Sequence, residues 1–239
     1  MSTFVVTGAS RGLGLEYAKQ ISARGDIVFA CARDPEQAQD LKQIVDNQKV
    51  FAIQLDVTCE KSIKEAAEEI SKHAPEGIDV LVNNAGFMGT RTNIEEATKD
   101  ELFQTFGTNV AAVNEVIKGF LPLLRKRGDE RVKKIVNISS SLGSIRSATT
   151  YLAGCNTLGS YRVSKAALNM LTKLQALHLA KENFIVCSIH PGWCKTEMGG
   201  ENAHLTTEES VIPQLAKIDS ITASENGEFF NWKGDIEEY

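Results

Sequence analysis

Features of secreted, membrane-spanning and metal-binding proteins are missing from this sequence. No run of about 18 apolar residues could cross a bilayer, and residues 1–8 form neither a cationic segment nor an apolar signal segment. The five cysteines are an odd number, show no Cys-x-x-Cys spacing and lie near no histidine pair. From these absences we expect a cytoplasmic protein with no membrane partner, no disulfide framework and no metal site.

A basic excess is missing as well. The chain has 26 Lys and Arg against 31 Asp and Glu, a formal net charge of −5, and its basic clusters at 125–127 and 133–134 are short and lie among apolar residues. A nucleic-acid partner is therefore not expected. The clusters instead predict the solvated last turn of a helix, where cations suit the dipole, with Gly128 as the residue that ends it.

Linkers and internal repeats are also absent. No segment rich in Pro, Ser and Gly divides the chain, and no motif recurs at a period of about 20 to 50 residues. With 42% hydrophobic and 24% charged residues, the composition is that of a globular protein. We predict a single domain over 1–239, with a substrate loop and lid at about 192–220.

The sequence does contain a repeated unit of a short apolar run, a turn and an amphipathic stretch. The apolar runs predict strands at 4–7, 27–32, 50–55, 80–83, 134–138, 184–189 and 227–230. The amphipathic stretches predict helices at 14–23, 36–45, 62–72, 102–124, 161–180 and 207–219, and Asp34 and Pro35 suit the start of the second helix. Short, unalternating apolar runs are typical of buried parallel strands. The alternation predicts a doubly wound parallel α/β sheet of the Rossmann type.

A glycine-rich turn joins the first predicted strand to the first helix, with Gly8, Gly12 and Gly14 in Thr-Gly-Ala-Ser-Arg-Gly-Leu-Gly. Glycines let the backbone approach a pyrophosphate closely, and the N–H groups of the helix N-terminus attract its charge. The turn alone also fits an ordinary strand-to-helix connection, and its spacing differs from the commonest dinucleotide-binding fingerprint.

Tyr161 and Lys165 are four residues apart in a predicted helix, which places them on one face. A free phenol has a pKa of about 10, and a neighbouring ammonium lowers this pKa because it favours the phenolate. The phenol then becomes a usable acid or base. Taken alone, the pair is more typical of an ordinary contact on a helix surface.

Four ordered motifs give the chain a family resemblance: Thr-Gly-x-x-x-Gly-x-Gly at 7–14, Asn-Asn-Ala-Gly at 83–86, Tyr-x-x-x-Lys at 161–165 and Pro-Gly at 191–192. Together they resemble the short-chain dehydrogenase/reductase family over essentially the whole chain. The stretches 138–145, 161–169 and 191–200 more narrowly resemble sniffer-type carbonyl reductases and C-factor-like members. The resemblance implies NADP(H)-dependent reduction of a ketone, aldehyde or quinone.

The resemblance also implies a dinucleotide site along the carboxyl ends of the strands. Its expected residues are Gly8, Ser10, Arg11, Gly12, Leu13, Gly14, Arg33, Asp56, Val57, Asn83, Ala85, Gly86, Tyr161, Lys165, Pro191, Gly192, Trp193 and Thr196. No carboxylate ends the second predicted strand, whereas Arg11 and Arg33 suit the 2'-phosphate of NADP(H), which we expect over NAD(H). Alternatively, Arg33 pairs with Asp34 or Glu36 at the surface.

For catalysis, the resemblance implies four residues. Tyr161 would protonate the substrate oxygen and Ser140 would position it, while Lys165 would lower the pKa of Tyr161 and hold the nicotinamide ribose. Asn109 would hold a water that connects Lys165 to solvent, unless it is simply a helix residue bonded to backbone.

Ser139 and Ser141 are alternatives to Ser140 in an offset alignment. The period of two along a strand puts Ser139 on the opposite face from Ser140, so only one of those two faces the site. Gly143, three residues after Ser140, favours the choice of Ser140.

The segment between Ser140 and Tyr161 is longer than in most family members, because these residues are 21 positions apart. Sniffer-type members carry a similar insertion. Here it contains Cys155 and also Tyr151, which has no lysine four residues later. We expect the segment to wall an apolar pocket suited to an apolar or aromatic carbonyl. The expected wall residues are Phe87, Met88, Leu142, Ile145, Tyr151, Trp193 and Met198.

A nucleotide-binding signalling protein with little turnover is the alternative function that the C-factor-like resemblance leaves open. The presence of all four catalytic residues favours an enzyme. Extended epimerases or dehydratases fit the short chain poorly, and enoyl reductases space Tyr and Lys further apart. Family resemblance further implies a homodimer or homotetramer built on the helices at 102–124 and 161–180.

Overall fold

Apolar segments form one parallel sheet in the computed structural model, which describes residues 1–149 and 157–239 and has seven strands within them. The strands are β1 (Thr3–Thr7), β2 (Ile27–Ala32), β3 (Val50–Gln54), β4 (Val80–Asn83), β5 (Lys133–Ile138), β6 (Phe184–His190) and β7 (Phe229–Asn231). Their order is β3-β2-β1-β4-β5-β6-β7, and every neighbouring pair is parallel. The strand order reverses between β1 and β4, where ligands of such sheets bind at the carboxyl ends. The predicted fold is confirmed.

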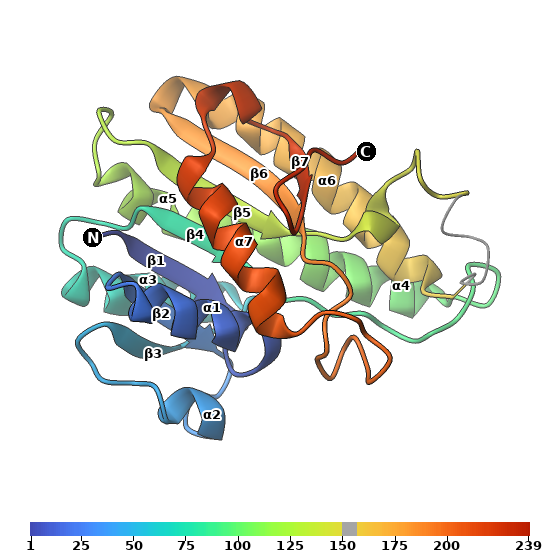
Figure 1. Ribbon diagram of the computed structural model, residues 1–239, viewed down its shortest axis with the longest axis horizontal. Coiled ribbons are helices and arrows are strands. Elements are labelled where there is room, and N and C mark those ends of the chain that lie inside the picture. The colour runs from blue at the N-terminus through green and yellow to red at the C-terminus, as the bar shows by residue number, and fades with distance from the viewer. Residues whose placement is uncertain (150–156) are drawn as a thin grey trace.

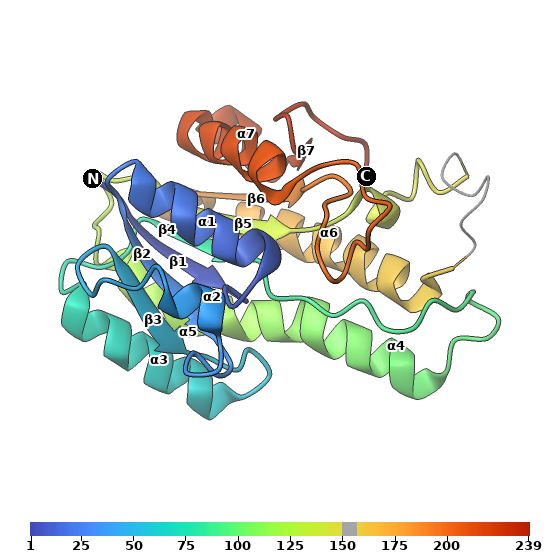
Figure 2. The same cartoon turned by 60° about the horizontal axis from the view of Figure 1, so that its bottom comes forward.

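Helices cover both faces of the sheet (Figures 1 and 2). One face carries α1 (Gly12–Ala23) and α7 (Thr207–Ser220), and the other carries α3 (Glu60–His73), α5 (Ala112–Arg125) and α6 (Gly159–Leu179). Each face has its own buried apolar cluster, with Tyr17 and Leu215 in the first and Phe120 and Leu168 in the second. All five residues of β1 are buried, because both faces of the sheet are covered.

The helix predicted at 36–45 is wrong in length. Only α2 (Gln39–Lys42) forms there. Asp34 Oδ1 accepts a hydrogen bond from the Gln37 backbone N at 3.2 Å, so Asp34 caps a turn rather than a helix. Leu41 is the one buried residue of α2, and a segment without an apolar stripe has little to hold it as a longer helix.

The helix predicted at 102–124 is interrupted. It consists of α4 (Lys99–Phe106), a π-helical turn at Gly107–Ala111 and α5. A π-turn inserts an extra residue into a helix and re-aims the side chains around it, and such turns are frequent at functional sites. Asn109 lies in this turn.

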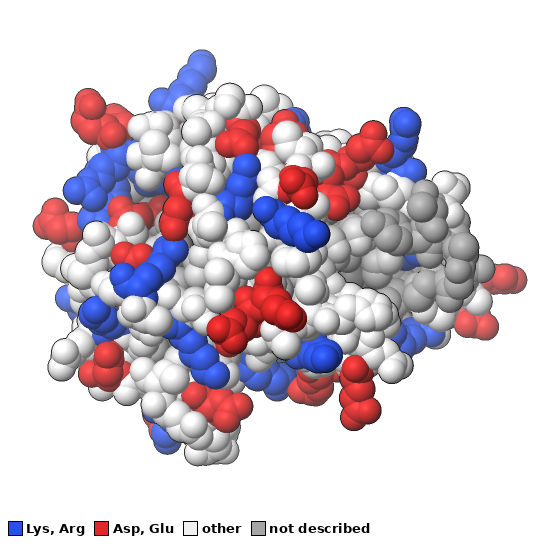
Figure 3. Space-filling model, viewed as in Figure 1, with Lys and Arg blue, Asp and Glu red and all other residues white. Residues whose placement is uncertain are grey.

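The two basic clusters have different environments. The cluster at 125–127 lies at the end of α5 as predicted, and Gly128 follows with φ +80°. The prediction is wrong for Lys133, which is 1% exposed and donates from Nζ to the Gly128 carbonyl at 2.8 Å. On the face shown in Figure 3, acidic and basic side chains are interspersed. Among the described residues, we find no helix with the length and apolarity needed to span a bilayer.

Candidate active site

The glycine-rich turn after β1 lies at the carboxyl edge of the sheet. Gly8 and Gly12 have φ values of +68° and +57°, which side-chain-bearing residues rarely adopt. A Cβ on Gly8 would stand 2.9 Å from Ala85 Cα, and one on Gly14 would stand 2.3 Å from the Gly8 carbonyl oxygen. The turn therefore brings bare backbone and the N-terminus of α1 to one place, an arrangement suited to phosphate.

The end of β4 holds this turn. Thr7 Oγ1 accepts hydrogen bonds from the backbone N of Asn84 and of Ala85, each at 3.0 Å, and Asn84 Nδ2 donates to the Thr7 carbonyl at 2.9 Å. The Asn83 side chain points elsewhere, since its Nδ2 donates to Asn137 Oδ1 at 2.9 Å. Sequence reasoning missed Thr7 and Asn84 as site residues. The signal for Asn84 was the Asn-Asn pair, because neighbouring residues along an extended strand face opposite ways.

Asp56 and Val57 follow β3, the strand at one end of the sheet, and both are half-buried. Asp56 Oδ1 accepts hydrogen bonds from Thr58 Oγ1 at 2.7 Å and from the Thr58 backbone N at 2.9 Å. These bonds, with a smaller contribution from the charge of Arg33, lower the pKa of Asp56. Arg33 itself is exposed directly after β2. The carboxylate and the guanidinium therefore share the corner where an adenosine would be expected.

The loop after β6 meets the glycine-rich turn. Arg11 Nε lies 2.9 Å from Glu197 Oε2, and both side chains are mostly exposed. A Cβ on Gly12 would stand 3.3 Å from Thr196 Cγ2. Ser10 and Leu13 complete the turn and are half-buried. Arg11, predicted to hold a 2'-phosphate, is thus paired with a carboxylate of the facing loop.

Contacts within the loop after β6 hold its conformation. Gly192 has φ +78°, and a Cβ there would stand 2.4 Å from Leu205 Cδ1. Trp193 Nε1 donates to the Gly199 carbonyl at 2.7 Å, and the Gly199 backbone N donates to Thr196 Oγ1 at 3.0 Å. These bonds place Thr196 toward the glycine-rich turn and leave the Trp193 side chain about half exposed.

Tyr161, Lys165 and Ser140 come together where β5 ends beside α6. Ser140 directly precedes a 3₁₀ turn (Ser141–Gly143), and its hydroxyl hydrogen-bonds Tyr161. Lys165 Nζ lies 5.5 Å from the centre of the Tyr161 ring and donates to the Ile138 carbonyl at 2.7 Å. The hydroxyl of Ser139 turns away and donates to Asn169 Oδ1 at 2.6 Å.

Burial governs the acidity of the pair. It raises the pKa of Tyr161 to about 12, although the hydrogen bond with Ser140 opposes this rise. It also lowers the pKa of Lys165 to about 8. The pKa of Tyr161 thus moves opposite to the direction predicted from the spacing, because desolvation of the buried phenol outweighs the opposing hydrogen bond. At neutral pH Tyr161 is protonated and Lys165 is mostly cationic.

The Asn109 side chain is fully buried in the π-turn. Its Oδ1 accepts from the Phe87 backbone N at 2.8 Å and its Nδ2 donates to the Phe87 carbonyl at 2.7 Å. Asn109 Nδ2 also donates to Ser164 Oγ at 2.9 Å, and Ser164 Oγ donates to the Tyr161 carbonyl at 2.7 Å. Asn109 therefore joins the strand-end segment after Gly86 to the helix that carries Tyr161 and Lys165.

Gly143 permits the contact between the 3₁₀ turn and α6. A Cβ there would stand 2.6 Å from the Lys165 carbonyl carbon and 2.8 Å from the Ala166 backbone N. We expect Gly143→Ala to lower the free energy of unfolding by about 1–3 kcal/mol, the usual cost of overpacking, and to lower turnover by displacing Ser140. Denaturant unfolding and steady-state kinetics would measure the two effects.

Gly107→Ala is the matched control, because a Cβ at Gly107 meets nothing within 4 Å. We expect it to stabilise the helix by a few tenths of a kcal/mol up to about 1 kcal/mol. Equal losses of stability in the two variants would contradict the role given to Gly143.

His190, at the end of β6, is an ionisable residue that sequence reasoning did not assign to the site. Burial lowers the pKa of His190 to about 4, so the imidazole is neutral near pH 7. It therefore adds no positive charge at the carboxyl end of β6. Its signal in the sequence was its position immediately before Pro191-Gly192.

The predicted pocket walls are only partly described. Phe87, Met88 and Leu142 are half-buried, whereas Ile145 is exposed. Trp193 and Met198 have 48% and 40% of their surface exposed, which leaves apolar area beside the loop. The expectations for Tyr151 and Cys155 lie outside the described residues.

Similarity to known proteins extends over nearly the whole of this chain. The family model described as short chain dehydrogenase matches residues 2–206. An uncharacterized oxidoreductase, C663.09c of Schizosaccharomyces pombe, is 34% identical, and the match covers 98% of this chain and 96% of that one. C-signal of Myxococcus xanthus is 33% identical over 66% of this chain and 90% of its own length.

Two solved structures share the fold closely. NADPH-bound carbonyl reductase from chicken fatty liver has a TM-score of 0.92 and 33% identity, and the match covers 100% of this chain and 99% of that one. The carbonyl reductase Sniffer of D. melanogaster has a TM-score of 0.92 and 29% identity, with both chains covered completely. The narrower resemblances predicted from the sequence are confirmed.

Proposed function

This chain belongs to the short-chain dehydrogenase family of oxidoreductases, and from that premise we propose that it uses NADPH to reduce the carbonyl group of a small apolar or aromatic molecule. The observation that carries the proposal is the meeting of Tyr161, Ser140 and Lys165 beside a glycine-lined turn at the strand ends. The carbonyl reductases with the same fold support the reaction class.

The residues at the sheet edge fit a dinucleotide. Gly8 and Gly12 have positive φ values, and a Cβ on Gly8 would collide with the Ala85 backbone. The turn can therefore adopt this conformation only with glycine at these positions, and its backbone stays open to a ligand. The first N–H groups of α1 point from this turn and suit the pyrophosphate. Asp56 and Val57 would hold the adenine end, while Thr196 and the Pro191-Gly192 turn would hold the nicotinamide end. When bound, NADPH supplies the hydride.

Tyr161 supplies the proton in this proposal. Its phenol is protonated at neutral pH and has the hydroxyl of Ser140 as a neighbour. A carbonyl oxygen that accepts hydrogen bonds from both hydroxyls is polarised as negative charge develops on it. Tyr161 then passes its proton to that oxygen, which becomes the alcohol.

Lys165 stabilises the phenolate that remains. Its ammonium is fixed by the Ile138 carbonyl and lies close to the Tyr161 ring, where a positive charge favours the ionised phenol. Asn109 keeps α6 in register with the segment after Gly86 through its bonds to Phe87 and Ser164.

Cofactor choice is tested at the two arginines. We expect Arg33→Ala and Arg11→Ala each to raise the KM for NADPH about 10- to 100-fold, the usual effect of removing a bond to a charged group, and to leave the KM for NADH within about threefold. Glu197→Gln frees Arg11 from its carboxylate partner and should lower the KM for NADPH up to about fivefold. Steady-state kinetics with both cofactors would measure this, and parallel shifts for NADPH and NADH would contradict the phosphate clamp.

The function itself is tested by the loss of reduced-nicotinamide absorbance with a panel of aromatic aldehydes, ketones, quinones and diketones. We expect turnover with NADPH in preference to NADH. Tight NADPH binding without turnover on any of these carbonyls would favour the alternative of a nucleotide-binding signalling protein, for which the similarity to C-signal is the supporting observation.

A further inference from the structure

A chain of hydrogen bonds crosses the interior from α1 to the loop after β6. Tyr17 Oη donates to Gln214 Oε1 at 2.6 Å, Gln214 Nε2 donates to Ser210 Oγ at 2.7 Å, and Ser210 Oγ donates to the Pro191 carbonyl at 2.6 Å. Tyr17 begins the chain as a donor. Gln214 and Ser210 each accept a hydrogen bond from the preceding side chain and donate one to the next group. The bonds therefore run in one direction and end on a backbone carbonyl.

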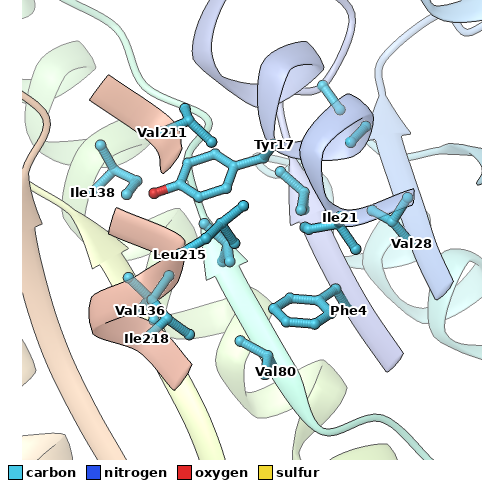
Figure 4. Packing of buried hydrophobic residues seen from close by; sticks show 14 of the residues in the cluster. Phe4, Tyr17, Ile21, Val28, Val80, Val136, Ile138, Val211, Leu215 and Ile218 are labelled. Carbon is cyan, nitrogen blue, oxygen red and sulfur yellow. The ribbon is translucent and has the colours of Figure 1, made fainter. Parts of the chain in front are cut away.

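The polar groups of this chain lie inside the protein, next to an apolar cluster. Tyr17, Ser210 and Gln214 all have 0% of their surface exposed. Figure 4 shows the Tyr17 ring within the apolar cluster between α1 and α7, with its oxygen directed toward the side of Val211 and Ile138. Burial raises the pKa of Tyr17 well above its usual value, so the phenol remains a donor. A buried carboxamide and two buried hydroxyls are tolerated only when all are bonded, which makes the geometry of the chain strict.

The two ends of the chain lie in two different parts of the proposed cofactor site. Tyr17 is on α1, one turn after Gly14 of the glycine-rich turn. Pro191 opens the Pro191-Gly192 turn, and its carbonyl also accepts a bond from Cys194 Sγ at 3.1 Å. Two buried donors thus fix the plane of one peptide group directly before Gly192.

We propose that the hydrogen-bond chain of Tyr17, Gln214 and Ser210, here called the relay, orients the Pro191-Gly192 turn toward the nicotinamide end of the cofactor. The relay also connects this turn to α1, the helix that holds the pyrophosphate. This proposal rests on the proposed function, because it needs a nicotinamide to position. It assigns Tyr17, Ser210 and Gln214, none of which touches the reacting atoms, an effect on one half of the cofactor.

The test compares two ligands in two variants that each lose a single oxygen. Tyr17→Phe and Ser210→Ala keep the packing of the core, so both are expected to fold. We expect their dissociation constant for NADPH, measured by nicotinamide fluorescence, to rise about three- to tenfold. The dissociation constant for 2'-phospho-ADP-ribose, which lacks only the nicotinamide ring, should stay within about twofold, since the relay acts on the turn that would orient that ring.

Tyr239→Phe is the matched control, because it also removes a tyrosine hydroxyl that donates a hydrogen bond, in this case to the Gly227 carbonyl and outside the chain from Tyr17 to Pro191. We expect it to leave both constants within about twofold whatever its effect on stability. Equal weakening of the two ligands in Tyr17→Phe and Ser210→Ala, or unchanged constants with lower stability alone, would overturn the relay and leave the proposed function standing. Failure of the wild-type chain to bind NADPH would overturn both.

Discussion

Tyr161→Phe should lower kcat for carbonyl reduction by about 10²- to 10⁴-fold, the range that positioned acids contribute. The substitution removes the hydroxyl that donates the proton and keeps the aromatic ring beside Lys165. Because the pKa of Tyr161 is about 12, the phenol of the wild-type chain keeps this proton throughout the neutral pH range. Steady-state kinetics with NADPH and any active carbonyl would measure the loss.

Ser139→Ala serves as the control for this prediction. Its hydroxyl lies one residue from Ser140 but bonds Asn169 instead of Tyr161. We expect turnover within a few-fold of the wild type, whereas Ser140→Ala should lose about 10²-fold or more, since it removes a donor to the developing negative charge. Activity of Tyr161→Phe near the wild-type level, with NADPH still bound, would contradict the assignment of the acid.

Lys165→Met should have the second large effect: it should lower kcat but raise the free energy of unfolding at neutral pH. Loss of the ammonium removes a charge that lowers a neighbouring pKa by about 1–3 units, so we expect kcat to fall about 10- to 10³-fold. In the wild type, reduction should decline as pH rises through about 8, because Lys165 loses its proton there. Lys165→Arg keeps its charge at these pH values, so whatever activity it retains should lack that decline.

The stability effect follows from the same buried amine. The pKa of Lys165 is about 8 in the folded chain, below the value of about 10.4 for an unfolded lysine. The unfolded chain therefore binds more protons between these values, and wild-type stability should rise as pH increases from about 8 to about 10.4. At pH 7 Lys165→Met should gain up to about 3 kcal/mol, at about 1.4 kcal/mol for each pKa unit. Denaturant unfolding at pH 7 and pH 10 would measure this, and a less stable variant at pH 7 would contradict it.

Much of the fold follows from sequence patterns because the strands are short, apolar and separated by helical stretches. β2 and β4 begin and end at the predicted residues, since turn residues bound their apolar runs. The π-turn around Asn109 has no such signal, because one extra residue in a helix leaves the apolar periodicity almost unchanged. The shortness of α2 likewise depends on tertiary packing, which leaves only Leu41 of that helix buried.

The candidate site was predictable as a set of motifs but not as a set of contacts. Spacing placed Tyr161 and Lys165 on one face of a helix, and the structure has them side by side. Their pKa values could not be read from spacing, because both depend on burial by segments distant in the sequence. The same holds for the pairing of Arg11 with Glu197, which joins the first loop of the chain to the loop after β6.

The central claim is that this chain moves a hydride to a carbonyl carbon while Tyr161 protonates the oxygen. The most direct measurement uses NADPH deuterated at both C4 positions of the nicotinamide, an active carbonyl compound, and mass spectrometry of the product. We predict an alcohol with one deuterium on the carbinol carbon from the wild-type chain and about 10²- to 10⁴-fold less of it per unit time from Tyr161→Phe. An alcohol without deuterium, or labelled alcohol formed equally fast by both chains, would contradict the mechanism.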